Sequence, residues 1–159
     1  MFTKSAYEGQ LSDQYHTLSK QLKALLEDEP NRIANLSNAS ALLGQFLDRI
    51  NWVGFYLMEE GELVLGPFQG LPACVRIAVG KGVCGTAVAK REIMVVPDVH
   101  AFPGHIACDA ASQSEIVVPM IKDGEVIGVL DIDSPEKDRF SEEDRKGLEE
   151  FVEVLVNYI

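Results

Sequence analysis

The stretch EIVVPMIKDGEVIGVLDID, residues 115–133, decides the fold class because it reads as two strands joined by a tight turn. Apolar side chains dominate both halves, and the Asp123-Gly124 pair between them is typical of a β-hairpin. Residues 115–121 and 125–133 are therefore predicted to form antiparallel strands.

Alternation along the second strand assigns its side chains to two faces. Leu130 and Ile132 share one face, whereas Asp131 and Asp133 share the opposite face. The apolar face suits a core under helices, so the two acids are expected on the other side of the sheet.

The turn decides where Glu115 points. A two-residue turn would pair Lys122 with Glu125, and in that register Glu115 would lie opposite Ile132. Glu115 would then face the core, where burying a carboxylate is costly.

A three-residue loop with Gly124 left-handed would instead place Glu115 opposite Asp131, on the acidic face. A break at Pro119 would have the same effect. The cost of a carboxylate in the core favours this second register.

Residues 50–58, INWVGFYLM, show the same two faces with aromatic side chains on the second one. Trp52 and Tyr56 share a face with Gly54. The other face is apolar and suits the core: Val53, Phe55 and Leu57. An aromatic wall and an acidic floor on one sheet face predict a covered pocket rather than a bare apolar patch.

The rest of the chain supplies helices and further strands. Helical periodicity spans 11–27 and continues after Pro30, which fits the first turn of a second helix with Asp28 or Glu29 near its cap. Ser141 and Asp144 begin a last helix as a capping box. Additional elements are expected as strands at 62–66, 74–79 and 93–96 and as a short helix at 83–90.

These elements predict an α+β domain with a mainly antiparallel sheet of about six strands. The N- and C-terminal helices are expected on one face. The other face is left to the short helix at 83–90 and to a long loop at 97–113, which would act as a lid over the pocket.

Composition limits the class of protein. The chain has 159 residues, 47% of them hydrophobic, so 1–159 is predicted to be one domain. A net charge of −11 argues against nucleic acid and against anionic membranes as partners. No apolar run is long enough to span a bilayer and no signal segment is apparent, which predicts a cytoplasmic location.

Three cysteines lie within one short region: Cys74, Cys84 and Cys108. An odd number cannot pair completely within one chain. In a reducing compartment such cysteines are candidates for catalysis, redox sensing or metal binding rather than for structural disulfides.

The surroundings of the cysteines leave these uses open. Cys84 follows a glycine-rich turn at a helix start, where backbone N–H groups stabilise a thiolate or bind a carboxylate. Cys108 follows His105, whose imidazolium would lower the pKa of the thiol. A metal site from His100, His105, Cys108 and Cys84 lacks close ligand spacing, so no metal is predicted.

Three motifs, GVCGTA at 82–87, PDVHAFPGHIACDAASQSEIVVP at 97–119 and GVLDIDSP at 128–135, closely resemble those of the free methionine-(R)-sulfoxide reductases. These enzymes are stand-alone GAF domains, and the resemblance covers essentially the whole chain. It implies reduction of free methionine-(R)-sulfoxide to methionine, without a metal or organic cofactor.

The resemblance also implies a role for each site residue. Cys108 matches the nucleophile, Cys74 the main resolving cysteine and Cys84 an accessory one. Thioredoxin would reduce the resulting disulfide. The substrate pocket corresponds to Trp52, Tyr56, Glu115, Asp131 and Asp133.

Within that pocket, Glu115 and Asp133 are the candidate proton donors to the sulfoxide oxygen, because clustered carboxylates raise one another's pKa. Asp131 would hold the substrate ammonium, and Trp52 and Tyr56 would enclose the S-methyl group. GAF domains often dimerise, so a homodimer is an expectation. The alternatives are a regulatory GAF module that only binds a small ligand, and a thiol redox sensor without a substrate.

Overall fold

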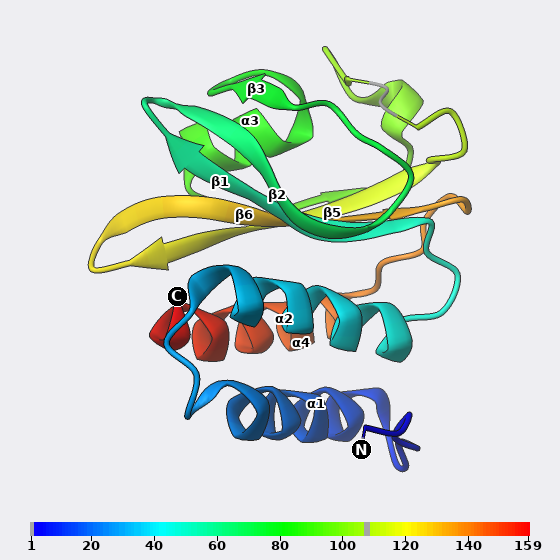
Figure 1. Ribbon diagram of the computed structural model, residues 1–159. Helices are drawn as coiled ribbons and strands as arrows, with labels where there is room; N and C mark the ends of the chain where they lie inside the picture. The colour runs from blue at the N-terminus through cyan, green and yellow to red at the C-terminus, as the bar shows by residue number, and fades with distance from the viewer. Residues whose placement is uncertain (1, 107–108) are drawn as a thin grey trace.

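The computed structural model describes residues 2–106 and 109–159, which form one sheet with different layers on its two faces (Figure 1). Long helices cover one face. A short helix, an edge strand and loops cover the other. The predicted α+β architecture of a single domain is therefore confirmed.

The described elements match most of the predicted ones. The helices are α1 (Leu11–Leu26), α2 (Arg32–Phe46), α3 (Gly82–Lys90) and α4 (Glu142–Leu155), with short 3₁₀ helices η1 (Val99–Ala101) and η2 (Val156–Tyr158). The strands are β1 (Trp52–Glu59), β2 (Glu62–Gly70), β3 (Arg76–Ala78), β4 (Met94–Val96), β5 (Ser114–Lys122) and β6 (Glu125–Ser134). Strand β2 extends beyond its predicted end, and η1 lies within the loop predicted at 97–113.

The sheet has the strand order β3-β2-β1-β6-β5-β4, and every neighbouring pair is antiparallel. Strands β1 and β6 lie at its centre, which places the aromatic and acidic positions of the two strands side by side. Trp52 is paired with Asp133, and Gly54 with Asp131.

The turn between β5 and β6 corrects one prediction. Lys122 pairs with Glu125, so the turn has two residues, and Asp123 and Gly124 both have positive φ angles (52° and 81°), as a type I′ turn requires. The predicted three-residue loop is wrong. Type I′ turns match the right-handed twist of the flanking strands better than type I or type II turns do.

The predicted side for Glu115 is nevertheless confirmed, because a β-bulge compensates for the short turn. Ile121 pairs with Val126 and Met120 with Gly128, which leaves Ile127 as an extra residue. One extra residue shifts the register and exchanges the faces beyond it. Glu115 is therefore opposite Asp133, not Asp131 as expected, but it shares the acidic face.

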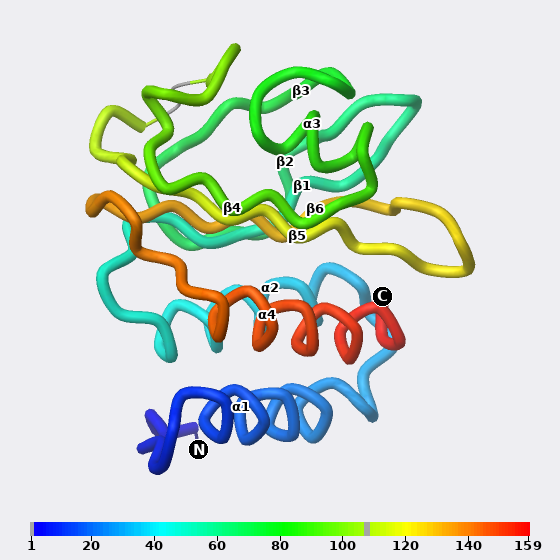
Figure 2. Tube along the Cα trace, turned by 180° about the vertical axis from the view of Figure 1, so that it is seen from behind, coloured from blue at the N-terminus to red at the C-terminus, as the bar shows by residue number. Residues whose placement is uncertain are grey.

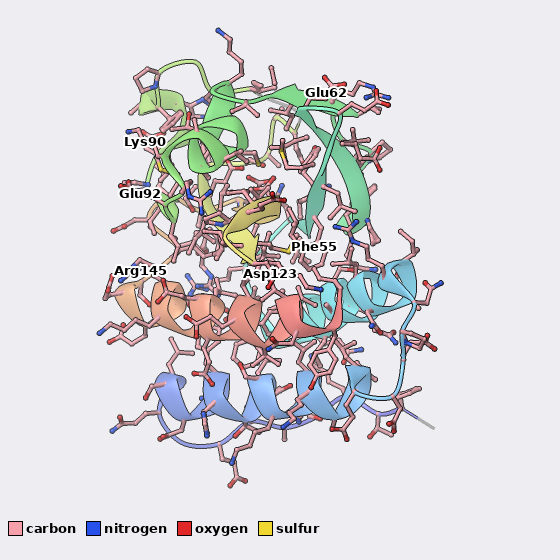
Figure 3. All side chains as sticks on the ribbon, turned by 90° about the vertical axis from the view of Figure 1, so that its left-hand side faces the viewer. Phe55, Glu62, Lys90, Glu92, Asp123 and Arg145 are labelled. Atoms are coloured by element: carbon pink, nitrogen blue, oxygen red, sulfur yellow. The ribbon has the colours of Figure 1, made fainter. Side chains whose placement is uncertain are left out.

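The helical side is built in two layers rather than one. Figure 2 shows α2 and α4 against the sheet and α1 beyond them. The main core fills the space between helices and sheet, and Phe55 (labelled in Figure 3) lies fully buried in it. The predicted placement of the N- and C-terminal helices on one face is thus confirmed. Helices α2 and α4 contact the sheet directly, whereas α1 buries its apolar stripe against these two helices.

The starts of two helices test the capping predictions. Ser141 and Asp144 form the predicted capping box at α4. At α2 the prediction is wrong, because Pro30 precedes the helix and Asn31 is the N-cap, accepting a hydrogen bond from Ala34 N at 2.9 Å. Glu29 does lie near the cap as expected, because its Oε2 accepts a hydrogen bond from Asn31 N at 2.8 Å, but the helix N–H group is capped by the Asn31 side chain.

A close approach of α1 and α4 yields a stability prediction. A Cβ atom at Gly147 would lie 2.1 Å from the ring of Tyr15. Gly147→Ala is therefore expected to lower the free energy of unfolding by about 1–3 kcal/mol, measured by denaturant titration. Gly44→Ala is the matched control in α2, where the nearest atom lies 3.7 Å away, and it should raise stability by about 0.5–1 kcal/mol. Equal stability of the two variants would contradict this packing.

The opposite face of the sheet carries a second buried cluster. It contains Trp52, Tyr56, Ile77, Val83 and Cys84 among others, contributed by β1, β3 and α3. The second cluster encloses the pocket that the strand alternation predicted.

Among the described residues, no helix is long and apolar enough to cross a bilayer.

Candidate active site

A pocket opens on the face of the sheet away from α1, α2 and α4. The sheet supplies its floor from β1, β5 and β6. Its walls come from the segment before β3, the start of α3 and the loop that precedes β5. All predicted sheet residues of the site line it: Trp52, Tyr56, Glu115, Asp131 and Asp133.

Two aromatic side chains form one wall. Trp52 and Tyr56 are almost fully buried, and their rings stack with centroids 5.9 Å apart. The ring of Phe68 on β2 also stacks on Trp52, with the ring centroids 5.1 Å apart. Such a stack fixes the Trp52 ring as a flat apolar surface, which suits contact with a small alkyl group.

The same aromatic residues hold the segment that carries Cys74. Trp52 Nε1 donates a hydrogen bond to the carbonyl of Leu71 at 3.1 Å, and the Tyr56 hydroxyl donates one to the carbonyl of Cys74 at 2.9 Å. Burial raises the pKa of Tyr56, so its hydroxyl stays protonated and keeps this donor role. The half-buried Cys74 is thereby held next to Ala73, which lines the pocket.

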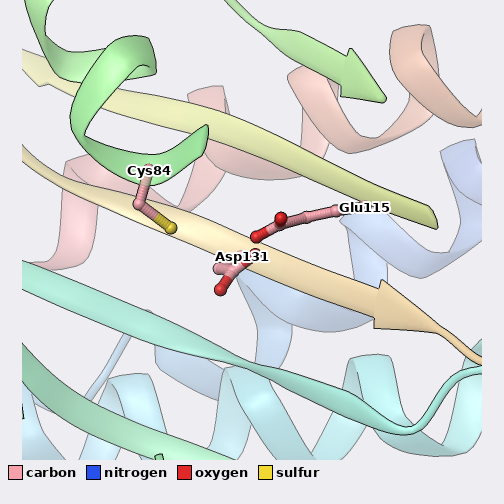
Figure 4. A group of neighbouring side chains, drawn as sticks. All are labelled: Cys84, Glu115 and Asp131. Atoms are coloured by element: carbon pink, nitrogen blue, oxygen red, sulfur yellow. The ribbon is translucent and has the colours of Figure 1, made fainter. Parts of the chain in front are cut away.

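The acidic floor consists of three carboxyl groups on adjacent strands. Glu115 and Asp131 are both 6% exposed, and Asp133 lies opposite Glu115 in the register of β5 and β6. Figure 4 shows the side chains of Glu115 and Asp131 close together beside Cys84. No basic side chain forms an ion pair with Asp131 or Asp133 among the described residues, so the cluster is not neutralised from within.

Burial and mutual repulsion set the protonation of the three acids. Desolvation raises the pKa of Glu115 well above its usual range, and the nearby charges of Asp131 and Asp133 raise it further. Desolvation and Asp131 likewise raise the pKa of Asp133 well above normal.

Asp131 differs from the other two. Desolvation raises its pKa too, but hydrogen bonds with Glu115 and Cys84 act to lower it. Asp131 is thus the carboxyl that ionises first, while Glu115 and Asp133 retain their protons. The site combines one anionic carboxylate with two protonated acids.

Glycines place Cys84 over this floor. Gly80 and Gly82 have positive φ angles (86° and 61°) in the turn that leads into α3. A Cβ atom at Gly85 would lie 2.4 Å from the carbonyl oxygen of Ala78, so only glycine permits the approach of α3 to β3. The third residue of the helix, Cys84, therefore points to the acids rather than to solvent.

The environment of Cys84 contradicts one of the alternatives left open by the sequence, a thiolate stabilised at the helix start. Burial raises the pKa of the Cys84 thiol well above its usual value, and the carboxylates of Asp131, Glu115 and Asp133 raise it further. The start of α3 does not offset three nearby acids. Cys84 is therefore a buried thiol.

His105 also differs from its predicted role. Its Nε2 atom lies 3.8 Å from Glu115 Oε1, yet desolvation and His100 lower the pKa of His105. A protonated Glu115 offers no charge to hold an imidazolium. The imidazole is therefore neutral near pH 7, and the predicted imidazolium beside Cys108 is not supported.

Cys108 lies outside the described residues. The described residues that flank positions 107–108, Ile106 and Asp109, both line the pocket. The end of this loop is fixed by Asn51, whose Nδ2 donates to Asp109 Oδ2 at 2.9 Å and to Ser112 Oγ at 3.1 Å. Sequence reasoning missed Asn51 because an isolated amide before a strand gives no periodic signal.

Comparison with known proteins agrees with this geometry. The family profile described as "GAF domain" matches residues 23–159. The chain belongs to the GAF domain family. A relative from Escherichia coli, "Free methionine-R-sulfoxide reductase", is 55% identical over 141 residues, which are 89% of this chain and 86% of the relative.

Two solved structures extend the comparison to three dimensions. The structure of fRMsr of Staphylococcus aureus in complex with substrate has a TM-score of 0.87 and 56% identity, and the match covers 99% of both chains. Free methionine-R-sulfoxide reductase from Neisseria meningitidis, in complex with its substrate, has a TM-score of 0.93 and 43% identity, covering 99% of this chain and 95% of the other. The resemblance inferred from the three motifs is confirmed.

Proposed function

We propose that this GAF domain reduces free methionine-(R)-sulfoxide to methionine by thiol chemistry. The observation that carries the proposal is the substrate complex of the Staphylococcus aureus protein, which is 56% identical over 99% of both chains. The pocket supports it, because an apolar wall, an anionic carboxylate and protonated acids suit the methyl, ammonium and sulfoxide groups of this molecule.

The first step is attack of the Cys108 thiolate on the sulfoxide sulfur. The sulfur–oxygen bond of the substrate breaks as its oxygen is transferred to the cysteine. A proton from Glu115 or Asp133 neutralises the negative charge that grows on that oxygen. Methionine is the reduced product, and Cys108 becomes a sulfenic acid.

The sulfenic acid is then removed in two steps. The thiol of Cys74 condenses with it, which forms a disulfide and releases water. A dithiol reductant, which we propose to be thioredoxin, exchanges with the disulfide and returns both cysteines to thiols. Because Cys84 is a buried thiol, its proposed part is accessory. No metal or organic cofactor enters any of these steps.

The remaining parts of the proposal concern the protein in the cell. We place it in the cytoplasm, where thiols are kept reduced. We also propose a homodimer, for which a groove between the N-terminal segment, α1 and α2 offers apolar side chains, among them Phe2, Leu25 and Leu42. Light scattering of the purified protein tests the dimer directly.

The proposed function is tested by incubating the reduced protein with free methionine-(R)-sulfoxide and dithiothreitol and measuring methionine by chromatography. Methionine should form from this epimer and not from the (S) epimer. A module that only binds the ligand, or a redox sensor without a substrate, would release no methionine.

Capping the substrate ammonium tests the role of Asp131. N-acetylation removes the charge that the buried carboxylate would hold, and a charge-assisted hydrogen bond contributes about 1.5–3 kcal/mol. We expect kcat/KM for N-acetyl-methionine-(R)-sulfoxide to be roughly 10- to 100-fold lower than for the free amino acid. Similar kcat/KM values for the two compounds would refute a pocket closed around a free ammonium.

Removal of Cys74 tests the second step. Cys74→Ser should release about one methionine per chain and then stop in the presence of thioredoxin, because the sulfenic acid forms but the disulfide does not. Mass spectrometry of the unmutated protein after one turnover should show Cys74 linked to Cys108. A bond between Cys84 and Cys108 alone would transfer the resolving role to Cys84.

A further inference from the structure

Three possible metal ligands meet at the base of the pocket from three different elements: Cys84 from α3, Glu115 from β5 and Asp131 from β6 (Figure 4). Their sulfur and oxygen atoms all lie within 4.8 Å of one another. All three side chains are buried. This arrangement brings soft and hard donors together around one point, away from bulk water.

A second observation points to a missing partner at this point. Asp131 is only 6% exposed, and its Oδ1 atom has no hydrogen-bond partner among the described residues, so the hydrogen bonds of this carboxyl group with Glu115 and Cys84 leave one oxygen unpartnered. A buried carboxylate oxygen without a partner carries a desolvation cost that a cation would offset. The reaction proposed above uses Asp131 for an ammonium group, which is also a cation.

We propose that Cys84, Glu115 and Asp131 form a binding site for a thiophilic divalent cation such as Zn²⁺, which excludes the sulfoxide while it is bound. Cation binding releases the protons that Cys84 and Glu115 hold in the empty pocket. The resulting thiolate and two carboxylates supply three ligands for Zn²⁺, once the longest separation closes by about 1 Å. The three negative charges of the ligands exceed the two positive charges of the cation, so the occupied site has one net negative charge.

The fourth ligand position faces the pocket, where it is open to water or to the His105 imidazole. Three protein ligands and an open position are typical of zinc sites that remain accessible to small molecules. The thiolate selects Zn²⁺ and Co²⁺ over Mg²⁺ and Ca²⁺, which prefer oxygen ligands alone.

Cobalt binding to a protein with a single cysteine provides the test. The chain has three cysteines, so Cys74→Ser combined with Cys108→Ser leaves Cys84 as its one thiol. Titration with Co²⁺ should give one ion per chain and a thiolate-to-cobalt charge-transfer absorption. Zn²⁺ should displace the cobalt, and Mg²⁺ at millimolar concentration should not.

Further variants in this background identify the ligands. Cys84→Ser should abolish the absorption, and Glu115→Gln and Asp131→Asn should each weaken Co²⁺ binding about tenfold or more, because each removes a ligand. Asp133→Asn is the matched control, since this acid lies in the pocket but outside the group. The Glu115 and Asp131 variants keep the thiol, so the test does not depend on how well the Cys84→Ser protein folds.

Three results would overturn the site: no charge-transfer absorption with millimolar Co²⁺, an absorption that survives Cys84→Ser, or equal affinity in the Glu115→Gln, Asp131→Asn and Asp133→Asn proteins. The claim of exclusion, which rests on the proposed function, has its own measurement. The single-cysteine protein cannot reduce methionine-(R)-sulfoxide, so the compound stays intact during the titration. If the two ligands exclude each other, the sulfoxide should displace the cobalt, and persistence of the absorption would refute exclusion. Methionine formation by the unmutated, metal-free protein decides the proposed function separately.

Discussion

Replacing Cys108 with serine is expected to abolish methionine formation, even in a single-turnover assay without reductant. Serine is too weak a nucleophile for the sulfoxide sulfur unless a base activates it. His105 is neutral, and its neighbour Glu115 is protonated, so no carboxylate is paired with the imidazole to make it a stronger base. We expect the rate of methionine formation to fall by about 10⁴-fold or more, measured by rapid quench and chromatography.

Cys84→Ser is the matched control for this experiment. Its thiol is buried and held protonated by three acids, so it cannot replace Cys108 as the nucleophile. The Cys84→Ser protein should therefore still form methionine in a single turnover. A Cys108→Ser protein that forms methionine at the normal rate would exclude Cys108 as the nucleophile and direct attention to the other two cysteines.

The faces of the central strands could be predicted from the sequence because alternation is a local property of an extended chain. Trp52 and Tyr56 on one strand, and Asp131 and Asp133 on the next, lie in the pocket as expected. No knowledge of the neighbouring elements was needed. Their sequence spacing of two or four residues was sufficient once the segments were recognised as strands.

The position of Glu115 shows where local patterns stop being sufficient. It was placed on the correct face for an incorrect reason, because the turn is short and the bulge at Ile127 restores the register. A bulge depends on the fit between two strands and leaves no periodic mark in either of them. The energetic argument against a carboxylate in the core predicted the correct face for Glu115. The bulge that places Glu115 there could not be predicted from the sequence.

The environment of Cys84 depended on packing and could not be read from the sequence. The glycine-rich turn correctly predicted a helix start, and a helix start by itself favours a thiolate. The close contact of Gly85 with Ala78 turns the side chain towards acids from two other strands. Likewise, the apolar stripe of α1 predicted one buried face, but not that the other helices would cover it instead of the sheet.

Substitutions in the acid cluster are expected to cause a large decrease in the rate of methionine formation. Glu115→Gln and Asp133→Asn should each slow methionine formation by about 10²- to 10⁴-fold, the usual range for loss of a general acid. Asp131→Asn should mainly raise KM, as expected for loss of ammonium binding. Glu125→Gln, at the exposed end of the same hairpin, should leave both parameters unchanged.

The pH dependence follows from the raised pKa values. Glu115 and Asp133 act as acids only while protonated, so kcat should decrease as the pH rises through their raised pKa values. Because the two groups interact with Asp131, the decrease reports the cluster rather than one residue. The pH–rate profiles of the Glu115→Gln and Asp133→Asn proteins should each lack part of this decrease.

Glu115→Gln should lower activity but raise stability, and the gain in stability should depend on pH. A carboxyl whose folded-state pKa is raised contributes its full stability below its unfolded pKa, about 4.3 for glutamate, and loses that contribution as the pH rises through the folded value. A glutamine at position 115 does not ionise, so its contribution to stability does not fall as the pH rises. The melting temperature of Glu115→Gln should therefore exceed that of the unmutated protein by more at about pH 8 than at about pH 5. A Glu115→Gln protein that retains kcat but melts at a lower temperature at both pH values would show that Glu115 supports the fold rather than the reaction.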